Sequence, residues 1–509
     1  MAIVVPVDTT DGRRHLRVAS PATQEVTGDI SVTSADDVRA AVARARAAQP
    51  AWAATSFAER AVIMRRAAEI LRTDQARFID VIRRDTGRSQ FESLMMEVFP
   101  ALDSLTYYAK HAAAILGDRR PGLHLLRTKK LLVTYRPLGV VGIITPWNGP
   151  FILGLNPTVQ ALMAGNAVLL KPSEVTPFAG ALVGELLAEA GLPADVLQIV
   201  QGDGATGAAL VDGGVDKISF TGSVATGRKV GEACGRNLIP CTLELGGKDA
   251  MIVCDDADLE RAAGGAVFGA FFNAGQFCCG TERVYVHQGI AEDFIRRVVE
   301  KTRALRQGTD GEFDVGPMIW PRQLDTIERH MADAVARGAT VRCGGRRNLE
   351  AGELCYEPTV LTDVTHDMLI MQDETFGPIL PIVVVADDDE AIRLANDSRY
   401  GLSGTVWSKD KARAVAIAKR LDTGSVCVND SSITYGACEA PFGGRKASGV
   451  GQVNGDTGLR GYCHAQPILV DRFGPKEEQV WYPYTADKER TLQKVIRWVW
   501  GTPLGRWMS

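Results

Sequence analysis

The stretch FFNAGQFCCGTER, residues 271–283, places two cysteines side by side in a glycine-flanked turn after an apolar run. A cysteine thiolate can attack an electrophilic carbon and hold it covalently, provided that other groups stabilise the charge that develops. Either Cys278 or Cys279 could supply that thiolate. We therefore searched the rest of the chain for a base and an oxyanion donor.

Glu244 and Asn148 are the candidates for these two roles. Glu244 stands in LELGGK (243–248), at the end of an apolar strand, where partial burial would raise its pKa toward the range of a general base. Asn148 stands in TPWNGP (145–150), where prolines stiffen the turn and the amide could donate to a developing oxyanion. Each also has a structural interpretation, a helix cap for Glu244 and a turn former for Asn148.

Two further motifs indicate a nucleotide site. In FTGSVATG (220–227), Gly222 permits a close backbone approach and Ser223 begins a helix whose N-terminus suits a pyrophosphate. In KPSEVTP (171–177), Lys171 and Glu174 follow a strand and could reach a ribose. A carboxylate there would accept hydrogen bonds from ribose hydroxyls and repel a 2′-phosphate, which favours NAD over NADP. Taken alone, each motif could also be an ordinary turn.

The remaining cysteines are scattered along the chain, which has ten cysteines and seven histidines. No CxxC pair and no Cys/His cluster at zinc spacing occurs, so the sequence predicts neither disulfides nor a structural metal. A papain-like cysteine–histidine dyad would have to be assembled from distant residues, and no local signature indicates one.

The elements that must position these residues alternate between strands and helices. Short apolar runs at 140–145, 167–171, 196–200, 217–220 and 249–254 are separated by helix-length segments such as 177–190 and 224–235. This alternation predicts a parallel α/β sheet, which we interpret as a doubly wound nucleotide-binding domain up to about residue 245. A second α/β domain, with strands at 378–385 and 424–429, is expected over 246–445.

Outside these two units the patterns differ. The first hundred residues are predicted to be mostly helical, with a helix capped by Ser34 and a second helical pattern over about 57–84. The segments 125–136 and 466–472 are strand-like but isolated, and we expect such strands to pair across a subunit boundary.

Composition limits the classes of function. The chain has 509 residues, 46% hydrophobic and 23% charged, which is typical of a globular protein of two or three domains. The net charge of −4 argues against nucleic acid as a partner. No signal peptide and no apolar run of about 20 residues is evident, so we expect a cytoplasmic protein.

Eight motifs occur together in a fixed order: TPWN, KPSE, FTGSVATG, LELGGK, FFNAGQFCCG, DETFGP (373–378), NDSRYGLSGTVWSKD (396–410) and PFGGRKASG (441–449). From about residue 20 to 472 the chain resembles the NAD(P)-dependent aldehyde dehydrogenase superfamily. The resemblance implies a Rossmann-type cofactor domain over 1–245, interrupted by oligomerisation strands at about 120–137. It further implies a catalytic domain over 246–445, a return to the cofactor domain with an oligomerisation strand over 446–472, and an extension over 473–509.

The resemblance also implies roles for individual residues. The family pattern F-x-x-x-G-Q-x-C assigns the nucleophile to Cys278 and leaves Cys279 as a packed neighbour. The implied oxyanion donors are Asn148 and the Cys278 N–H, while Glu244 would activate water and thereby favour release of a free acid over transfer to coenzyme A. The implied cofactor is NAD, with NADP as the alternative, and its contacts are Trp147, Lys171, Glu174, Gly204, Gly222, Ser223, Leu245, Glu374 and Phe376.

At two positions the chain departs from common family residues. Gly149 stands where a bulky aromatic is common, and Asn156 stands where tryptophan is frequent. We therefore expect a wide substrate pocket, with aromatic walls from Phe277, Tyr435 and Phe442, that favours a bulky, aromatic or long-chain aldehyde. Alternatively, other side chains refill the space and the substrate is a small semialdehyde or of betaine-aldehyde type. A cysteine esterase and a non-catalytic binding protein are the alternatives from other classes, and a homodimer or homotetramer is expected.

The last segment, 473–509, is a second departure because most relatives end near residue 472. Thr485 is placed to cap a helix with apolar residues on one face, at Leu492, Val495, Ile496, Val499 and Trp500. Basic residues accompany it (Lys488, Arg490, Lys494, Arg497), as do tryptophans at 481, 498, 500 and 507. This pattern fits a peripheral membrane contact, or a helix that packs on its own or a neighbouring subunit.

Overall fold

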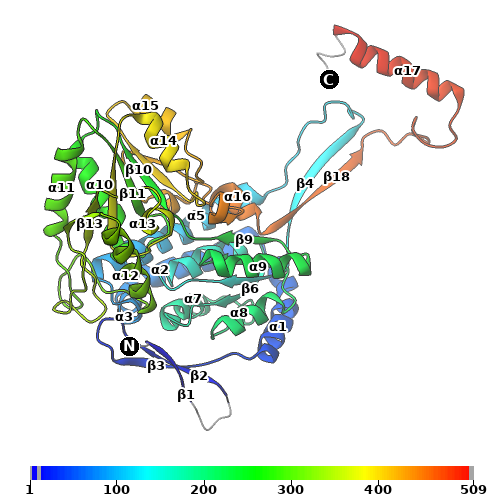
Figure 1. Cartoon of the computed structure of the whole chain (residues 1–509). Coiled ribbons are helices and arrows are strands. Elements are labelled where there is room, and N and C mark those ends of the chain that lie inside the picture. Colours follow the sequence, from blue (N-terminus) through cyan, green and yellow to red (C-terminus); the bar gives the residue numbers. More distant parts are fainter. Residues whose placement is uncertain (1–2, 8–12, 504–509) are drawn as a thin grey trace.

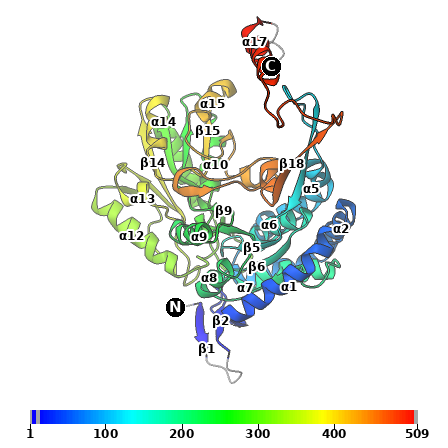
Figure 2. The ribbon, with the colours of Figure 1, turned by 90° about the vertical axis from the view of Figure 1, so that its right-hand side faces the viewer.

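The computed structural model describes residues 3–7 and 13–503 and shows a body built around two large β-sheets, with a narrow arm projecting from it (Figure 1). Trp507 lies outside the described residues. The two sheets and their helices lie side by side in the body, and the arm rises from one side (Figure 2). The α/β class expected from the sequence is confirmed.

The first large sheet has six strands in the order β17-β9-β8-β5-β6-β7. All neighbouring strands are parallel except β17, which pairs antiparallel with β9. The bounds are β5 (Val140–Ile144), β6 (Ala167–Lys171), β7 (Leu197–Ile199), β8 (Lys217–Thr221), β9 (Cys241–Glu244) and β17 (Gly449–Val450). These strands confirm the apolar runs predicted at 140–145, 167–171, 196–200 and 217–220. Strands β5 and β6 are buried along their whole length because helices cover both faces, whereas β7, at the edge of the sheet, is half-buried.

Helices surround this sheet. The crossovers are α6 (Ile152–Met163), α7 (Pro177–Glu189), α8 (Gly204–Val211) and α9 (Val224–Asn237). Before them come α1 (Ala35–Ala53), α2 (Phe57–Thr73), α3 (Gln75–Thr86), α4 (Gln90–Ser93), the π-helix η1 (Leu94–Val98) and α5 (Phe99–Leu116). Ser34 caps α1 as predicted, since its Oγ accepts from the Asp37 N–H at 3.1 Å.

Two details of the first hundred residues differ from the prediction. The segment 57–84 forms two helices rather than one, because Asp74, at φ −117° and ψ 31°, leaves the helical conformation between α2 and α3. The segment before α1 is an antiparallel sheet of β1 (Val4–Val7), β2 (His15–Ala19) and β3 (Val26–Ser31). These strands carry few buried side chains, so their hydrophobic pattern is weak.

The second large sheet has seven strands in the order β12-β13-β14-β11-β10-β15-β16, parallel except for the β12–β13 pair. The bounds are β10 (Asp249–Val253), β11 (Thr281–His287), β12 (Thr340–Cys343), β13 (Thr359–Thr362), β14 (Ile379–Val385), β15 (Gly404–Trp407) and β16 (Cys427–Val428). Strand β16 is shorter than the predicted 424–429, because the Gly424 N–H bonds to the carbonyls of Gly401 and Leu402 in a turn.

The helices of the second sheet are α10 (Leu259–Phe271), α11 (Ala291–Arg303), α12 (Arg322–Ala336), α13 (Leu369–Gln372), α14 (Asp388–Asn396) and α15 (Lys411–Ala418). Short 3₁₀ segments are η2 (Phe272–Gly275), η3 (Thr434–Gly436) and η4 (Lys446–Ser448), and α16 (Gly455–Arg460) leads toward the arm. Among the described residues, no helix is long and apolar enough to cross a membrane.

The arm consists of β4 (Lys129–Pro137) and β18 (Cys463–Asp471), the two segments predicted as isolated strands. They pair antiparallel with each other along their whole length, from Cys463 opposite Pro137 to Asp471 opposite Lys129. The outer edge of β18 has no strand partner in the part of the chain described. The chain then continues to α17 (Ala486–Gly501), which lies beyond the end of the arm (Figure 1).

The order of strands in the first sheet determines where a ligand can bind. From β5 the chain proceeds outward through β6 and β7, then returns to add β8 and β9 on the other side of β5. A crevice forms at the carboxyl ends of strands where the order reverses in this way. Asn148 and Gly222 lie in the segments that follow β5 and β8, and Glu244 is the last residue of β9.

The turn that carries the two cysteines depends on one glycine. Gly275 has φ +74°, and a Cβ added there would lie 2.2 Å from the carbonyl oxygen of Gly377. Only glycine therefore allows this turn to pack against the backbone of the DETFGP segment.

We expect Gly275→Ala to lower stability, because it combines a left-handed conformation, which costs roughly 1–2 kcal/mol, with a clash against backbone. Gly311→Ala is the control, since Gly311 has φ +68° and no atom within 4 Å of the added Cβ. The apparent melting temperature should fall by several degrees more in Gly275→Ala than in the control. Equal shifts would contradict this account of the turn.

Candidate active site

The cysteine pair follows an irregular turn that hydrogen bonds hold in place. Helix α10 ends at Phe271, and Asn273 and Ala274 then adopt left-handed φ values of 52° and 54°. The side chains of Asn273 and Gln276 each donate to the other's backbone carbonyl, at 2.9 and 2.8 Å. The Ile319 N–H donates to Gln276 Oε1 at 2.7 Å. These bonds fix the backbone immediately before Cys278.

The surroundings of the two cysteines differ. Cys278 is half-buried and lines a cavity of about 240 Å³. Cys279 is buried, and its hydrogen bond with Cys278 together with its burial raises the pKa of the Cys279 thiol well above the usual value. Cys278 is therefore the cysteine that can meet a reactant, whereas Cys279 remains a packed thiol.

Glu244, at the end of β9, lines the same cavity as Cys278. Its side chain is buried, and neither carboxyl oxygen has a hydrogen-bond partner among the described residues. Burial, followed by the nearby Cys278 charge, raises the pKa of Glu244 well above 4.5. A buried carboxyl group without protein partners is costly unless a water or ligand bonds to it, so this group is suited to hold a water.

Asn148 lies on the wall of this cavity and is anchored by its backbone. Its carbonyl oxygen accepts from Arg88 Nη2 and from Asn273 Nδ2, the latter at 3.2 Å. Its side-chain Nδ2 donates to the Gln276 carbonyl at 3.1 Å. Because an amide nitrogen carries two hydrogens, one remains for a ligand.

A buried ion pair supports Asn148 from behind. Arg88 Nη1 lies 2.7 Å from Glu97 Oε1, and both side chains are at most 2% exposed. Arg88 Nε also donates to Asn273 Oδ1 at 2.8 Å, while Glu97 Oε2 accepts from the N–H groups of Phe151 and Ile152. Glu97 belongs to the π-helix η1, a local irregularity that often occurs at functional sites. The pair thus joins η1, the turn after β5 and the cysteine turn.

A larger cavity of about 720 Å³ continues from the first toward β6. The two cavities share part of their lining, which makes them one elongated channel: Pro146, Trp147, Thr221, Gly222, Ser223 and Trp320. Of the residues expected to contact a cofactor, the first cavity is lined by Trp147, Gly222, Ser223, Leu245, Glu374 and Phe376, and the second by Trp147, Lys171, Glu174, Gly204, Gly222 and Ser223.

The far end of the channel carries a lysine and a glutamate. Lys171 Nζ lies 3.6 Å from a Glu174 oxygen and donates to the Pro172 carbonyl at 2.8 Å. Burial lowers the pKa of Lys171, although the Glu174 charge opposes this effect. Between this end and Cys278, Ser223 caps α9, so the N-terminus of that helix points at the channel and suits a phosphate.

Glu374 and Phe376 lie on the opposite wall, close to the glycines of LELGGK. Glu374 Oε1 accepts from the Gly247 N–H at 3.0 Å, and a Cβ on Gly246 would lie 2.1 Å from its other oxygen. The Phe376 ring packs edge-on against Trp147, with centroids 5.4 Å apart. The two glycines therefore allow this carboxylate to approach the channel.

The expected substrate-pocket residues do not line the described cavities. Phe277, Tyr435 and Phe442 pack instead around the cysteine pair. Asn156 is buried and donates to the Tyr435 hydroxyl at 3.3 Å and to Asn454 at 2.8 Å. A Cβ on Gly149 would lie 3.0 Å from Leu153, with Met96 also close. Leu153 and Met96 thus fill the space beside Gly149, so the missing aromatic there does not by itself widen the pocket.

Several residues of the site had no sequence signal. Arg88 and Glu97 stand in none of the motifs. Asn273 lies within FFNAGQFCCG, but its role depends on contacts with Arg88, 185 residues away, and with Asn148, 125 residues away. Trp320, Gln323 and Thr326 complete the cavity beside Cys278. The Trp320 ring lies 6.2 Å from that of Trp147, an arrangement that no spacing rule would reveal.

Comparison with known proteins identifies a family. The model described as "Aldehyde dehydrogenase family" matches residues 7–468. A Mycolicibacterium smegmatis protein named "Putative succinate-semialdehyde dehydrogenase", with NADP(+) in its name, is 40% identical over 473 residues, 92% of this chain and 91% of its own. The 4,4′-diapolycopene aldehyde oxidase of a Methylomonas species is 38% identical over 490 residues, 96% of this chain and 91% of its own.

Solved structures are also similar. The Mycobacterium tuberculosis aldehyde dehydrogenase complexed with NAD⁺ has a TM-score of 0.86 and 34% identity, covering 92% of this chain and 97% of that one. An NADP-dependent enzyme of E. coli has a TM-score of 0.87 and 33% identity, covering 92% of this chain and 96% of that one.

Proposed function

This chain belongs to the aldehyde dehydrogenase family, and from that premise we propose that it oxidises an aldehyde to the free carboxylic acid with NAD as cofactor. One observation carries the proposal. Cys278, Glu244 and Asn148 line a single cavity that opens into a channel long enough to have separate ends for a reacting carbon and for a nucleotide.

Cys278 acts as the nucleophile in the proposed reaction. Its thiolate Sγ attacks the aldehyde carbon, and the carbonyl electron pair moves to oxygen. The remaining Asn148 Nδ2 hydrogen and the Cys278 N–H donate to that oxyanion. Arg88, Glu97 and Asn273 act as positioning residues, because they hold the Asn148 backbone and the cysteine turn. The bound nicotinamide would supply the hydride acceptor. On loss of the hydride the carbon–hydrogen bond of the former aldehyde carbon breaks, the oxyanion electron pair re-forms the carbonyl, and Cys278 carries a thioester.

Glu244 completes the proposed reaction. Once a thioester is formed on Cys278, the Glu244 carboxylate removes a proton from water, and the resulting hydroxide attacks the thioester carbon. The carbon–sulfur bond then breaks, the acid leaves and the Cys278 thiolate is regenerated. Neither Glu244 oxygen has a hydrogen-bond partner among the described residues, which supports this role because both oxygens are left for a water.

The residues proposed to hold the dinucleotide divide between the two ends of the channel. Lys171 and Glu174 would bond the adenosine ribose, and the turn at Gly222 and Ser223 would hold the pyrophosphate. Glu374 would bond the nicotinamide ribose. The Glu174 carboxylate would repel a 2′-phosphate, which is why we propose NAD although several relatives are named for NADP(+).

We propose an apolar, bulky or long-chain aldehyde as the substrate, with a small semialdehyde as the alternative. No lysine or arginine is among the described residues that line the cavity beside Cys278, so a substrate with a second, ionised carboxylate would find no cation there. The apolar side chains of Trp147, Leu153, Trp320 and Phe376, which line that cavity, suit an apolar group.

The proposal assigns one domain to each of the two large sheets. The six-stranded sheet, within residues 1–245 and completed by 446–472, would form the cofactor domain. The seven-stranded sheet, within 246–445, would form the catalytic domain. The free edge of β18 and its exposed Ile468, Leu469 and Val470 would pair with another subunit in a homodimer or homotetramer.

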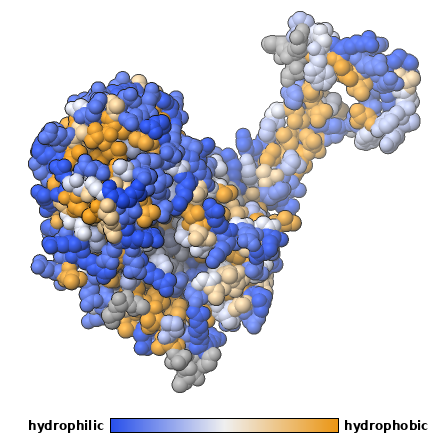
Figure 3. Space-filling view, viewed as in Figure 1, coloured by the Kyte–Doolittle hydropathy of each residue, from blue (hydrophilic) through white to orange (hydrophobic). Residues whose placement is uncertain are grey.

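The extension beyond the arm is proposed to bind a lipid surface. Helix α17 has only one buried residue, Val499, while Leu492, Val495, Ile496, Trp498 and Trp500 are each 46–54% exposed. Figure 3 shows apolar side chains on α17 and along the arm. Lys494 and Arg497 lie in the second half of α17 and make no ion pair with a carboxylate among the described residues, so an anionic lipid surface complements them.

The chemistry is tested by turnover of short, long-chain and aromatic aldehydes with NAD and with NADP, measured by the absorbance of the reduced nicotinamide. We expect the highest kcat/KM with bulky apolar aldehydes and NAD. Cys278→Ser should abolish turnover, whereas Cys343→Ser, also half-buried but on β12, should not. Absence of turnover across the panel with both cofactors would refute the proposed function.

The role of Glu244 predicts a pH dependence. Because the pKa of Glu244 is raised, its carboxylate forms only as pH rises through that raised value. The pH profile of kcat should therefore have a rising limb in that range. Glu244→Gln should slow hydrolysis about 10²–10⁴-fold and remove the limb. The acyl-enzyme should then accumulate, visible as a burst of one reduced cofactor per site and by mass spectrometry. The control is Glu300→Gln, on the surface of α11. An unchanged limb in Glu244→Gln would assign the base to another group.

Lipid binding is tested by co-sedimentation with vesicles of phosphatidylcholine alone or with phosphatidylglycerol. We expect binding to the anionic vesicles that is weakened at high salt. Leu492→Asp should reduce it at least tenfold, and Thr491→Asp, which adds the same charge about 100° away around the helix, should reduce it less. Equal effects, or equal binding to both vesicle types, would contradict the proposal.

A further inference from the structure

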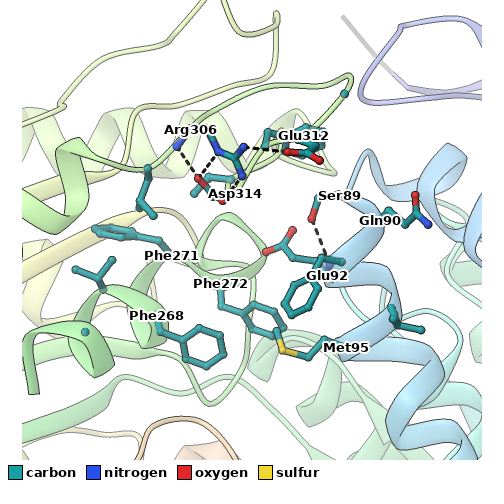
Figure 4. A pocket seen from close by; sticks show the side chains of 18 residues that line it. Ser89, Gln90, Glu92, Met95, Phe268, Phe271, Phe272, Arg306, Glu312 and Asp314 are labelled. Atoms are coloured by element: carbon teal, nitrogen blue, oxygen red, sulfur yellow. Dashed lines mark hydrogen bonds and ion pairs between the residues drawn. The ribbon is translucent and has the colours of Figure 1, made fainter. Parts of the chain in front are cut away.

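A second large cavity, of about 690 Å³, lies apart from the catalytic channel. It is enclosed by α4 and η1, by α10 and η2, and by the segment 305–315 (Figure 4). None of its lining residues lines either cavity of the channel. The Phe272 ring lines this cavity and packs edge-on against Phe277, the residue before Cys278, with centroids 5.2 Å apart. The proposed oxidation therefore does not use this cavity.

The walls of the cavity are largely apolar. Five phenylalanines contribute to them: Phe91, Phe268, Phe271, Phe272 and Phe313. Phe91 and Phe268 are 69% and 42% exposed, and Phe268 stacks on Phe272 with centroids 5.0 Å apart. Exposed aromatic surface gathered in a concave site favours an apolar ligand, since covering it removes hydrocarbon from water.

One polar group in the cavity lacks a partner. Glu92 is 5% exposed, and its Oε1 accepts from the Asn273 N–H at 2.8 Å, but its Oε2 has no hydrogen-bond partner among the described residues. Figure 4 shows its carboxyl group projecting toward the space between Asp314 and Phe272. In its ionised form this carboxylate would be satisfied by a hydrogen-bond donor that enters the cavity.

The charges around the cavity select the kind of donor. Three acidic residues line it, Glu92, Glu312 and Asp314, against one cation, Arg306. Arg306 is already engaged, since it bonds Asp314 at 3.0 Å and lies 3.4 Å from Glu312. Burial, with the Asp314 charge adding to it, raises the pKa of Glu92 to about 7 although Arg88 opposes this. A cationic donor would favour the ionised Glu92.

We propose that this cavity binds a small amphipathic organic cation, an alkylamine or arylalkylamine, whose ammonium group bonds Glu92 Oε2 while its hydrocarbon part lies against the phenylalanines. An ammonium group supplies the donor and the positive charge that the lining lacks. The hydrocarbon part covers the exposed faces of Phe91 and Phe268. The site is separate from the aldehyde and cofactor sites, so it does not depend on the proposed oxidation.

The test is calorimetric titration of the full chain with 2-phenylethylamine and with n-hexylamine, and with 2-phenylethanol as the uncharged counterpart. We expect one amine per chain, bound at least tenfold more tightly than the alcohol. Cys278→Ser should bind the amines unchanged, because Cys278 lies outside the cavity.

Two variants locate the site. Glu92→Gln keeps the shape of the side chain but removes its charge, and amine affinity should fall about tenfold. Gly264→Leu introduces a side chain into the cavity at a position where an added Cβ meets no atom of the described residues within 4 Å, and should weaken amine binding at least tenfold. Gly501→Leu, in α17, where an added Cβ likewise meets no atom of the described residues within 4 Å, is the matched control and should bind as the parent chain does. The proposal is overturned if the amines fail to bind, if the alcohol binds as well, or if Gly264→Leu retains binding.

Discussion

The buried pair of Arg88 and Glu97 is the interaction on which the geometry of the catalytic site depends. Two charges removed from water are stabilising only when their geometry is close and the remaining hydrogen-bonding positions are filled. Both conditions hold, because Arg88 also bonds Asn273 and the Asn148 carbonyl, and Glu97 accepts two backbone N–H groups of the turn after β5. Breaking such a pair typically costs about 3–5 kcal/mol, which makes the arrangement resistant to small shifts.

This network explains why Asn148 and Cys278 can act on the same atom. They come from different sheets, since Asn148 follows β5 and Cys278 precedes β11. Without a rigid link, the relative position of the two sheets would vary with every side-chain rearrangement at their boundary. Asn273 supplies the link, because it bonds Arg88, the Asn148 carbonyl and the Gln276 carbonyl at once. The Glu92 carboxylate, which lines the other cavity, accepts a hydrogen bond from the Asn273 N–H of the same turn. This turn therefore contributes to the walls of both cavities.

The chemistry-bearing residues were predictable because each stands in a short local pattern. Gly222 and Ser223 follow β8, Glu244 ends β9 and Cys278 stands in the turn before β11. The carboxyl ends of parallel strands meet at one edge of a sheet, which brings Gly222, Ser223 and Glu244 together. The strands were predictable for a related reason, since burial on both faces leaves continuous apolar runs. The sheet of β1, β2 and β3 was missed, because a sheet with few buried residues leaves no such run. The split of 57–84 was missed because Asp74 lies between helices whose apolar positions continue in phase.

The sequence alone determined which residues can react, the parallel α/β class and the family resemblance, because these follow from residue type and from spacing within a few turns of chain. The tertiary structure determined the burial and the contacts of those residues. It separated Cys278 from Cys279 by burial, filled the space beside Gly149 with Leu153 and Met96, and left the oxygens of Glu244 without partners. It also paired the two isolated strands with each other and assembled the Arg88 network. The strand pairing and the contacts of Arg88 with Asn273 join segments far apart in the chain, and sequence spacing carries no information about such distances.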